Sequence, residues 1–576
     1  MKRKLQTLLL ASFLGTGLAA QPLYWAASMG SGSDESGNAI VTDPLGNVYT
    51  TGYFMGTVDF DPGAGVTSLV STGSYDVFIT KTGPSGNLIW AKKMGGVSYD
   101  YGMGIALDSA CNVYTAGYYQ YTMDMNPGTA TANVNSAGSL DAFISKLDSA
   151  GNYIWGKSFG GLGPDQINSI FVDKKGIIYT TGTFQSTADF DPSAATVNMT
   201  SAGGNDIFVS KFTSAGTLVW AKQMGSPAGS YGDAGYDIAA DTAGNVYTIG
   251  SFKATADFDP GAGTYTYSCV GGFNDDIFIS KLDSAGNFVW AEAFGDYNYD
   301  DGYSIALDDS SNVYATGKFY AVVDFDASAD SMKLDGGSGG DAFVLKLNNA
   351  GNFKWVRQLG DLYGDEGFGI ALDSSANVYT TGSYEGTVDF DPGAGVFTLA
   401  TAASYRNVFV SKLDAMGNFI GAAGLGGTST QDRANAIAVD NTNKILITGY
   451  MDGTGDYDPG AGVYDLVSTG GTDIFIAKLD VLLTAPTGIS AYSNGNQDAT
   501  VYPNPFTDKL TVMVNTTEQE ATDIFIYNLL GELVYTESNV AGKTIGLDRN
   551  AMNKGIYIYS LVQGNQIISK GKLIAQ

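Results

Sequence analysis

Residues 141–161 read DAFISKLDSAGNYIWGKSFGG, and nearly the same letters return over residues 276–295 as DIFISKLDSAGNFVWAEAFG. Each stretch holds two runs of alternating apolar and polar residues on either side of a Gly-Asn turn. This pattern is typical of two antiparallel strands joined by a tight hairpin. The stretch therefore predicts a β-hairpin that the chain uses more than once.

A second signature keeps phase with the first. The stretch GIALDSACNVYTAG from Gly104 returns as SIALDDSSNVYATG from Ser304 and as GIALDSSANVYTTG from Gly369. It places an apolar run, a turn and another extended run ahead of the hairpin. One repeat therefore holds four short predicted strands, which in the copy that starts at Gly104 cover residues 105–107, 113–119, 142–147 and 153–159.

An acidic hairpin, DFDPGAG at residues 59–65, gives the period of the repeat. Successive copies begin 65 to 68 residues apart, at Asp59, Asp124, Asp189, Asp257, Asp324, Asp389 and Asp456. Four antiparallel strands repeated seven times predict an all-β chain that forms a seven-bladed β-propeller with four-stranded blades.

The two ends of the repeat array complement each other. The seventh copy stops at DIFIAKLD, residues 473–480, without a fourth strand, whereas LYWAASMG at residues 23–30 is a fourth strand without a repeat. We expect the N-terminal strand to complete the last blade, because closing the ring removes two exposed sheet edges. A Trp that we expect to pack between blades marks six fourth strands, and Gly421 takes its place in the seventh: Trp25, Trp90, Trp155, Trp220, Trp290 and Trp355.

Composition narrows the classes of function. The 576 residues include 59 acidic and 30 basic side chains, a net charge of −29, so the surface repels nucleic acid and anionic membranes. The chain has no His, which removes Ser-His-Asp triads and the usual zinc and haem ligands. The two cysteines, Cys111 and Cys269, stand in non-equivalent contexts, and we expect no disulfide between them.

Residues 1–20 have the pattern of a secretory signal peptide. A basic start (Lys2, Arg3, Lys4) precedes an apolar run and then small residues before Gln21. No later run of 18 or more apolar residues exists, so we expect no transmembrane segment.

The repeat resembles the bacterial β-propeller repeat family known as SBBP in its GIALD, NVYTTG and DAFISKLD segments. The resemblance covers most of the chain. It implies a seven-bladed propeller and assigns no chemistry to it.

The C-terminal part resembles a second family, the C-terminal sorting domain of the type IX secretion system. The matching segments are YPNP (502–505), YNLLGELV (527–534), KGIYIYSL (554–561) and GKLI (571–574). Taken alone, their alternating residues predict a small β-sandwich. The resemblance implies that the type IX machinery is a partner and that the protein is secreted or displayed on the outer surface of a Gram-negative, Bacteroidota-like bacterium.

These patterns predict four parts of the chain. They are a signal peptide (1–20), the propeller (21–483), a polar linker (484–497) and the sorting domain (498–576).

The acidic hairpin is a candidate metal-binding site. In an extended segment residues i and i+2 project to the same side, so Asp59 and Asp61 present paired carboxylates while Phe60 points into the core. Pro62 and Gly63 then turn the chain and expose carbonyl oxygens, which with carboxylates are calcium ligands. The candidate calcium ligands are Asp59, Asp61, Asp189, Asp191, Asp257, Asp259, Asp324, Asp326, Asp389, Asp391, Asp456 and Asp458. The alternative, that each Asp caps its own turn through hydrogen bonds to the backbone, stays open.

Two further sets of acids recur once per repeat. One lies five residues before the Ile of each innermost strand, and we expect it to ring the mouth of the central channel on the same face as the hairpins: Glu35, Asp100, Asp165, Asp233, Asp300, Asp365 and Asp432. The other precedes the turn after that strand, and we expect it to be structural: Asp43, Asp108, Asp173, Asp241, Asp308, Asp373 and Asp440.

A single active site must break a sevenfold pattern. The departures from the pattern neither fall on one blade nor supply a nucleophile with a base; they are Met123–Asn126, Lys174, Lys175, Cys269, Arg406, Asn407, Gly421 and Arg433. The sequence therefore predicts a non-enzymatic binding or adhesion scaffold for an extracellular glycan or matrix polymer, with cations bridging the acidic face. The alternatives are a hydrolase or lyase that acts on polysaccharide from that face and a structural surface-coat protein.

Overall fold

The computed structural model describes residues 23–480 except 228–231, 273, 327, 329, 362, 402–404, 428–430 and 461, together with 499–502, 509–514, 522–528, 533–540, 544–548, 554–563 and 566–575. Contacts divide the chain into two units, Met1–Leu483 and Thr484–Gln576. The predicted signal peptide (1–20) and linker (484–497) lie outside the described residues and stay predictions. Every regular element of the described residues is a β-strand, which confirms the all-β class.

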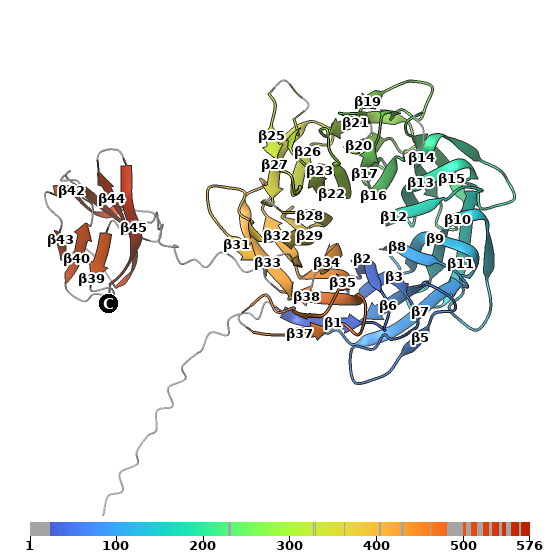
Figure 1. Cartoon of the computed structure of the whole chain (residues 1–576), viewed down its shortest axis with the longest axis horizontal. Coiled ribbons are helices and arrows are strands. Elements are labelled where there is room, and N and C mark those ends of the chain that lie inside the picture. Colours follow the sequence, from blue (N-terminus) through green and yellow to red (C-terminus); the bar gives the residue numbers. More distant parts are fainter. Residues whose placement is uncertain are drawn as a thin grey trace, which may run out of the picture. The chain divides into compact units, whose positions relative to one another are not determined.

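The larger unit repeats one arrangement of four antiparallel strands. In the first copy β2 (Ser36–Thr42), β3 (Val48–Phe54), β6 (Asp76–Thr82) and β7 (Leu88–Gly96) pair in that order, from inside to outside. The innermost strands surround the middle of the unit (Figure 1). In the other copies they are β8 (Asp100–Leu107), β12 (Gln166–Val172), β16 (Ala234–Ala240), β22 (Asp301–Leu307), β28 (Glu366–Leu372) and β34 (Arg433–Val439).

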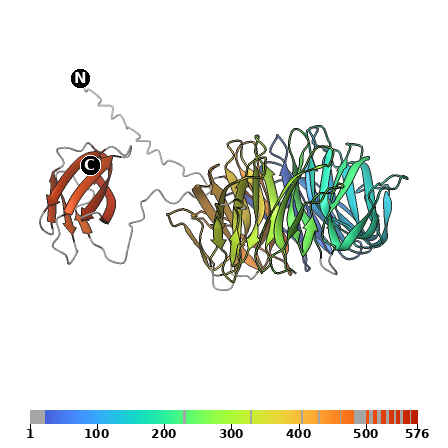
Figure 2. The same ribbon diagram turned by 90° about the horizontal axis from the view of Figure 1, so that it is seen from above.

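The remaining strands follow the same order and run between the two faces of the unit (Figure 2). The second strands are β9 (Val113–Asp124), β13 (Ile178–Asp189), β17 (Val246–Phe252), β23 (Val313–Phe319), β29 (Val378–Glu385) and β35 (Ile445–Met451). The third are β10 (Asn133–Leu147), β14 (Asn198–Phe212), β20 (Asp276–Leu282), β26 (Asp341–Leu347), β32 (Arg406–Leu413) and β38 (Asp473–Leu479). The outermost are β11 (Tyr153–Gly161), β15 (Leu218–Met224), β21 (Phe288–Phe294), β27 (Phe353–Leu359), β33 (Phe419–Gly427) and β1 (Leu23–Met29).

Short paired strands form the acidic hairpins between the second and third strands. They are β4 (Thr57–Asp59) with β5 (Ser68–Val70), β18 (Thr255–Asp257) with β19 (Thr266–Ser268), β24 (Val322–Asp324) with β25 (Lys333–Asp335), β30 (Thr387–Asp389) with β31 (Thr398–Ala400), and β36 (Thr454–Asp456) with β37 (Asp465–Val467). In the second and third copies the long strands β9 with β10 and β13 with β14 continue into the hairpin.

The N-terminal strand joins the last copy. β1 pairs antiparallel with β38, with Ala26 opposite Ala477, which is the pairing that the phase of the repeats predicts. The first and last copies also share a core that contains Met29, Phe54 and Leu446. None of the described sheets closes on itself, so the two ends of the array meet through packing and β1. A closed ring of seven blades stays our interpretation.

Two kinds of polar contact recur along the repeat. Asp43 Oδ1 accepts hydrogen bonds from the backbone N–H groups of Leu45 (3.0 Å) and Asn47 (2.9 Å), and its Oδ2 accepts one from the Tyr49 hydroxyl (3.2 Å). These bonds confirm the structural interpretation of the turn acids. Trp25 Nε1 donates to the carbonyl of Pro84 in the next copy (3.0 Å), so the Trp residues do pack between copies.

The smaller unit consists of two sheets. One contains β39 (Ala499–Tyr502), β40 (Lys509–Val514) and β43 (Thr544–Asp548); the other contains β42 (Leu533–Val540), β41 (Thr522–Asn528), β44 (Gly555–Gln563) and β45 (Gln566–Ala575). Leu510 and Val512 of the first sheet share one buried core with Ile524 and Leu561 of the second. Two sheets around one core form a small β-sandwich.

Candidate binding site in the central cavity

The hairpin acids form hydrogen bonds within their own turn. Asp59 Oδ1 accepts from the N–H groups of Asp61 (3.1 Å) and Thr67 (2.8 Å), and Asp61 Oδ1 accepts from Gly63 N–H (2.9 Å). A Cβ on Gly65 would lie 2.1 Å from Asp61 Oδ2, so a larger residue there would require this carboxylate to shift. The same bonds recur at Asp189, Asp191, Asp257, Asp259, Asp324, Asp326, Asp389, Asp391, Asp456 and Asp458.

These bonds match the turn-capping alternative. In the described part of the chain, no group of three or more Cys, Asp or Glu side chains could hold a metal ion. Calcium binding at the hairpins stays a prediction that this geometry does not favour.

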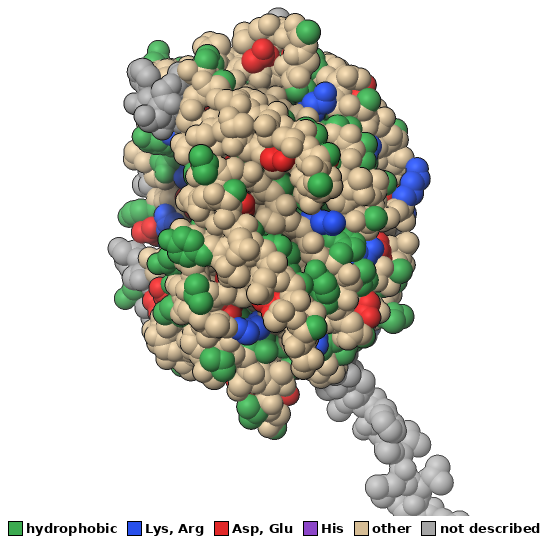
Figure 3. Space-filling view, turned by 90° about the vertical axis from the view of Figure 1, so that its right-hand side faces the viewer, with side chains coloured by type: hydrophobic (Ala, Val, Ile, Leu, Met, Phe, Trp, Pro, Cys, Tyr) green, Lys and Arg blue, Asp and Glu red, His purple; other side chains and the backbone are tan. Residues whose placement is uncertain are grey.

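The hairpins lie at the perimeter of the larger unit and not around the channel. β5, β19, β31 and β37 are all on the outside in Figure 1, and the backbone of Asp257 pairs with Gly225 at the end of the outermost strand of the preceding copy. Phe60 is buried against Phe54 and Phe78. On the side seen in Figure 3, acidic and basic side chains are scattered among neutral ones. Figure 3 views the perimeter and not the two faces of the unit, so the expectation that hairpin acids and channel acids share one face stays a prediction.

The seven acids expected to ring the channel mouth are buried between copies, which corrects that expectation. Asp100 has no exposed surface, and its Oδ2 accepts from Gly96 N–H at 2.6 Å. Loop acids are normally solvated, but here backbone N–H groups replace water. Each acid lies beside the residue that stands two positions before the Phe of the third strand of the preceding copy. The pairs are Asp76 with Asp100, Asp141 with Asp165, Asp206 with Asp233, Asp276 with Asp300, Asp341 with Asp365, Asn407 with Asp432, and Asp473 with Glu35.

We call these the carboxyl pairs. At Gly160 the side chains of Asp141 and Asp165 both lie 2.8 Å from the point that a Cβ would occupy. Burial raises the pKa of Asp141 to about 6; burial, followed by the charge of Asp141, raises the pKa of Asp165 to about 7. Asp141 Oδ1 is buried without a hydrogen-bond partner. The pairs are inter-copy contacts and not an exposed charged surface.

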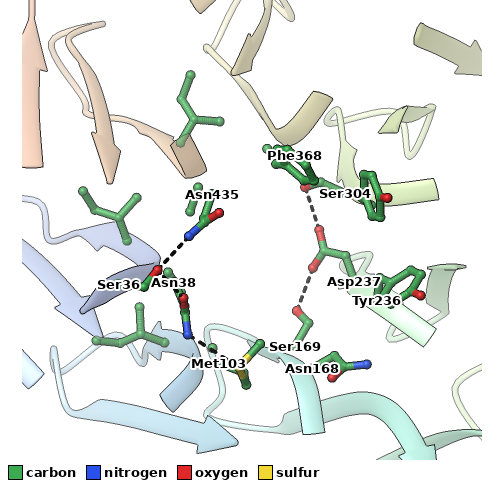
Figure 4. Close-up of a pocket in the computed structure, with 18 of the residues that line it drawn as sticks. Ser36, Asn38, Met103, Asn168, Ser169, Tyr236, Asp237, Ser304, Phe368 and Asn435 are labelled. Carbon is green, nitrogen blue, oxygen red and sulfur yellow. Dashed lines mark hydrogen bonds between the residues drawn. The ribbon is translucent and has the colours of Figure 1, made fainter. Parts of the chain in front are cut away.

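A cavity of about 550 Å³ lies in the middle of the larger unit, lined by residues of every innermost strand (Figure 4). The repeat pattern breaks here at two consecutive positions. The first is held by Asn38, Met103, Asn168, Tyr236, Tyr303, Phe368 and Asn435; the second by Ala39, Gly104, Ser169, Asp237, Ser304, Gly369 and Ala436. One half of the cavity wall is therefore mainly amide and the other half aromatic.

Asp237 is the one acidic side chain among the described residues of the cavity wall. Ser169 Oγ donates to its Oδ1 (2.6 Å) and Ser304 Oγ donates to its Oδ2 (2.8 Å), as Figure 4 shows. The backbone N–H groups of Ile238 and Ile305 each donate to it as well, both at 2.9 Å. Burial raises its pKa. With both oxygens occupied, Asp237 ties three neighbouring copies together.

In the amide half, each Asn donates its Nδ2–H to a glycine carbonyl of another copy: Asn38 to Gly102 (3.0 Å), Asn168 to Gly235 (2.9 Å) and Asn435 to Gly37 (3.0 Å). These bonds hold the amides in fixed orientations around the cavity.

In the aromatic half, the rings form a continuous row. The centroids of Tyr236 and Tyr303 lie 5.6 Å apart, and those of Tyr303 and Phe368 lie 4.9 Å apart. The guanidinium of Arg433 stacks on the far end of this row, 3.3 Å from the Phe368 centroid. The row offers ring faces and edges to the cavity, with a cation at one end.

Two different groups border the cavity. Tyr53, which lines it, contacts Tyr75 (5.0 Å between centroids) and Tyr101 (4.8 Å), and the adjoining Tyr99 is 46% exposed. Near Tyr303, charged side chains pair instead: Lys318 lies 3.5 Å from both Asp301 and Glu366, and Arg406 lies 3.8 Å from Glu366.

The structure brings together two repeat departures that the sequence left apart. Arg433 lines the cavity, and the N–H of the preceding Asp432 donates to the carbonyl of Arg406 (3.3 Å). The cavity was not predicted from the sequence, because the motifs shared by the copies do not include the two residues that precede the Ile of each innermost strand. A comparison of those positions across copies would have found it.

Family models match two parts of the chain. Residues 219–251 and 354–383 match the β-propeller repeat, and residues 500–576 match the secretion system C-terminal sorting domain. The type IX sorting domain places the protein outside the cell or on the outer surface of a Bacteroidota-like bacterium and makes the type IX machinery its partner. In the described residues no helix has the length and apolarity needed to cross a membrane.

Two curated proteins are similar to the chain. An uncharacterized WD repeat-containing protein of Acanthamoeba polyphaga mimivirus is 23% identical over 504 residues, which is 74% of this chain and 36% of that protein. The regulatory protein FlaEY of Caulobacter vibrioides is 26% identical over 144 residues, 25% of this chain and 15% of that protein. The chain therefore spans about a third or less of the length of these relatives.

Similarity to solved structures is weak. The extracellular domain of a putative hybrid two-component system from B. thetaiotaomicron is 10% identical with a TM-score of 0.16, covering 94% of this chain and 84% of that one. Dimeric latent PorU from Porphyromonas gingivalis is 12% identical with a TM-score of 0.11, covering 65% and 32%. These TM-scores are too low to relate the folds.

Proposed function

Because the chain carries β-propeller repeats and ends in a type IX sorting domain, we propose that it is a secreted or cell-surface, seven-bladed β-propeller that binds an extracellular glycan in its central cavity without breaking it down. The observation that carries this proposal is the cavity wall, where side chains that differ from copy to copy at equivalent positions face one common space.

The pairing of β1 with β38 and the shared core of the first and last copies support a closed ring. A closed ring leaves no unpaired edge in the last blade, and it holds the cavity wall rigid from all sides. A rigid wall lowers the entropic cost of binding, because the site does not have to order itself around the ligand.

The chemistry of the wall supports a sugar as the ligand. Sugar rings carry apolar C–H faces, which pack on aromatic rings such as Tyr303 and Phe368, and hydroxyls, which pair with amide and serine groups such as Asn435 and Ser36. A volume of about 550 Å³ lies within the usual range of small-ligand sites. The half-buried Tyr75 and Tyr101 and the exposed Tyr99 beside Tyr53 extend the aromatic surface outward, which suits a chain longer than the cavity.

The same wall argues for binding over hydrolysis. Glycoside hydrolysis needs two carboxyl groups roughly 5–9.5 Å apart, of which one is free to donate a proton to the leaving oxygen. Asp237 is the one acid of the described wall, and four hydrogen bonds occupy it. The hypothesis that the protein is a hydrolase or lyase therefore stays the alternative to the binding scaffold. It predicts release of reducing sugar ends, and the binding scaffold predicts none.

A glycan array probed with the purified full-length protein tests the proposal. Tyr303→Ala and Phe368→Ala remove the aromatic half of the wall and should abolish binding, whereas Tyr265→Ala, a 39% exposed ring in a perimeter hairpin, should leave it unchanged. Unchanged binding in both cavity variants, or loss in the perimeter control alone, would place the site elsewhere. Binding of no glycan or matrix polymer at all would reject the function.

A further inference from the structure

Arg433 is the one basic side chain among the described residues that line the central cavity. Its guanidinium stacks on Phe368, while its Nε is buried and has no hydrogen-bond partner. No acidic side chain of the described residues forms an ion pair with it, although the whole chain carries a net charge of −29. A half-buried guanidinium without a partner is costly to hold, and a ligand that accepts its hydrogen bonds removes that cost.

Asn435 supplies a second unused group beside it. Arg433 and Asn435 both lie on β34, on either side of Ala434, and both line the cavity. Asn435 donates through Nδ2 to Ser36 Oγ and to Gly37 O, both at 3.0 Å, while its Oδ1 is buried without a partner. A donor fork on Arg433 and an acceptor on Asn435 therefore border the same part of the cavity.

Two acidic side chains in and beside the cavity already have partners. Asp237 accepts four hydrogen bonds, and Glu366 lies within ion-pair distance of Lys318 and Arg406. Neither forms an ion pair with Arg433, so the guanidinium at the end of the aromatic row has no carboxylate partner among the described residues.

From this geometry we infer that the cavity selects an acidic glycan, with the carboxylate of a uronic acid residue on Arg433 and a sugar hydroxyl on Asn435 Oδ1. The inference rests on the proposed glycan-binding function and names the substrate class. A carboxylate is planar and singly charged, so one guanidinium both matches its two oxygens and balances its charge. A doubly charged phosphate monoester would keep a net negative charge in the cavity.

Paired ligands test the inference. Uronate polysaccharides such as alginate, pectate and hyaluronan are immobilised next to their carboxyl-reduced forms, which keep the sugar backbone and lose the charge, and are probed with the full-length protein. We expect binding to at least one uronate polymer and about 10- to 100-fold weaker binding to its reduced form, the usual range for hydrogen bonds to a charged group. Sulfated, uronate-free polymers should bind no better than the reduced forms.

Variants separate this inference from the proposed function. Arg433→Gln should lower uronate affinity by the same factor and leave binding of the reduced form unchanged. The control Arg357→Gln, which removes a guanidinium that stacks on Trp355 in an outermost strand, should change neither. Arg433→Lys keeps the charge without the stacked fork and should retain part of the affinity; it decides the matter if Arg433→Gln does not fold. Equal binding of acidic and reduced polymers, or full uronate affinity in the Arg433 variants, overturns the inference while the proposed function stands. Binding to no glycan overturns both.

Discussion

Replacing Asp141 by Asn should stabilise the protein at alkaline pH, because it removes one of two acids that share a buried contact. The chain already contains the neutral version: Asn407 stands where the other copies have Asp, and its amide nitrogen, in the orientation that satisfies it, donates to the carbonyl oxygens of Arg406 (3.1 Å) and Gly427 (3.3 Å). Asp141 is 3% exposed, and Ala137 N–H donates to its Oδ2 (3.0 Å), a bond that an Asn oxygen can keep.

The magnitude follows from the pKa. Burial raises the pKa of Asp141 from 3.8 to about 6, so the folded state binds the proton more tightly than the unfolded state. Such a group makes stability fall as the pH rises between the two values. At about 1.4 kcal/mol per pKa unit, ionised Asp141 costs the fold about 3 kcal/mol above pH 7, and about 0.5 kcal/mol at pH 4. Asp141→Asn should therefore raise the free energy of unfolding by up to about 3 kcal/mol at pH 8 and by little at pH 4.

Denaturant unfolding followed by Trp fluorescence measures this change, because all six Trp residues, at positions 25 to 355, lie in the larger unit. The reciprocal variant Asn407→Asp creates a seventh acidic pair and should destabilise the protein at pH 8 while leaving it nearly unchanged at pH 4. The reasoning is refuted if Asp141→Asn is no more stable than the parent at pH 8, or if its gain is the same at both pH values.

Three further measurements test other parts of the structure. Millimolar calcium against a chelator should leave the melting temperature within about 1 °C, since the hairpin carboxylates already cap their turns; a rise of several degrees that Asp-to-Asn changes at the hairpins abolish would instead establish calcium binding. Asp237→Ala should cost about 2–4 kcal/mol in a denaturant titration, because it leaves Ser169, Ser304 and a backbone N–H without an acceptor, and a cost below about 1 kcal/mol would contradict its role as an inter-copy tie. Gly65→Ala should lower the unfolding midpoint more than Ala64→Gly, because a Cβ at 65 would lie 2.1 Å from Asp61 Oδ2; equal effects would show that the carboxylate moves freely.

The residues that cap the turns and the order of the strands in each copy could be predicted from the sequence. Asp43 before a turn and Trp25 in a fourth strand are each repeated once per copy, and both act as structural devices. Gly421, an unexplained departure in the sequence, has a physical reason in the structure. Five of the six Trp residues donate to the turn between the third and fourth strands of the next copy, as Trp90 does to Ser149 O (3.3 Å). After Gly421 the next copy has no such turn, because β1 supplies its fourth strand from the other end of the chain.

The burial of the carboxyl pairs could not be predicted from the sequence, because an acidic residue in a connection between strands is normally exposed to solvent. The room for Asp76 comes from Gly95 at the end of an outer strand, where a Cβ would lie 2.4 Å from the Asp76 side chain. The partners that replace water, such as the N–H of Gly96 for Asp100, are backbone groups that no residue pattern specifies. Sequence periodicity therefore located these acids along the chain and misjudged their environment.

The central cavity could not be predicted from the repeat pattern either. Repeat analysis finds what the copies share, and shared residues such as Phe60 or Asp43 build the scaffold. A ligand site on a repeat scaffold has to come from residues that differ at equivalent positions and face one common point. The innermost strands provide that arrangement, since Asn435, Tyr303 and Asp237 line the same space from different copies. The perimeter hairpins cannot, because each repeats the same self-contained hydrogen bonds far from its counterparts. If this protein binds one ligand per molecule, the central cavity is where the differences between copies can add up to a specific site.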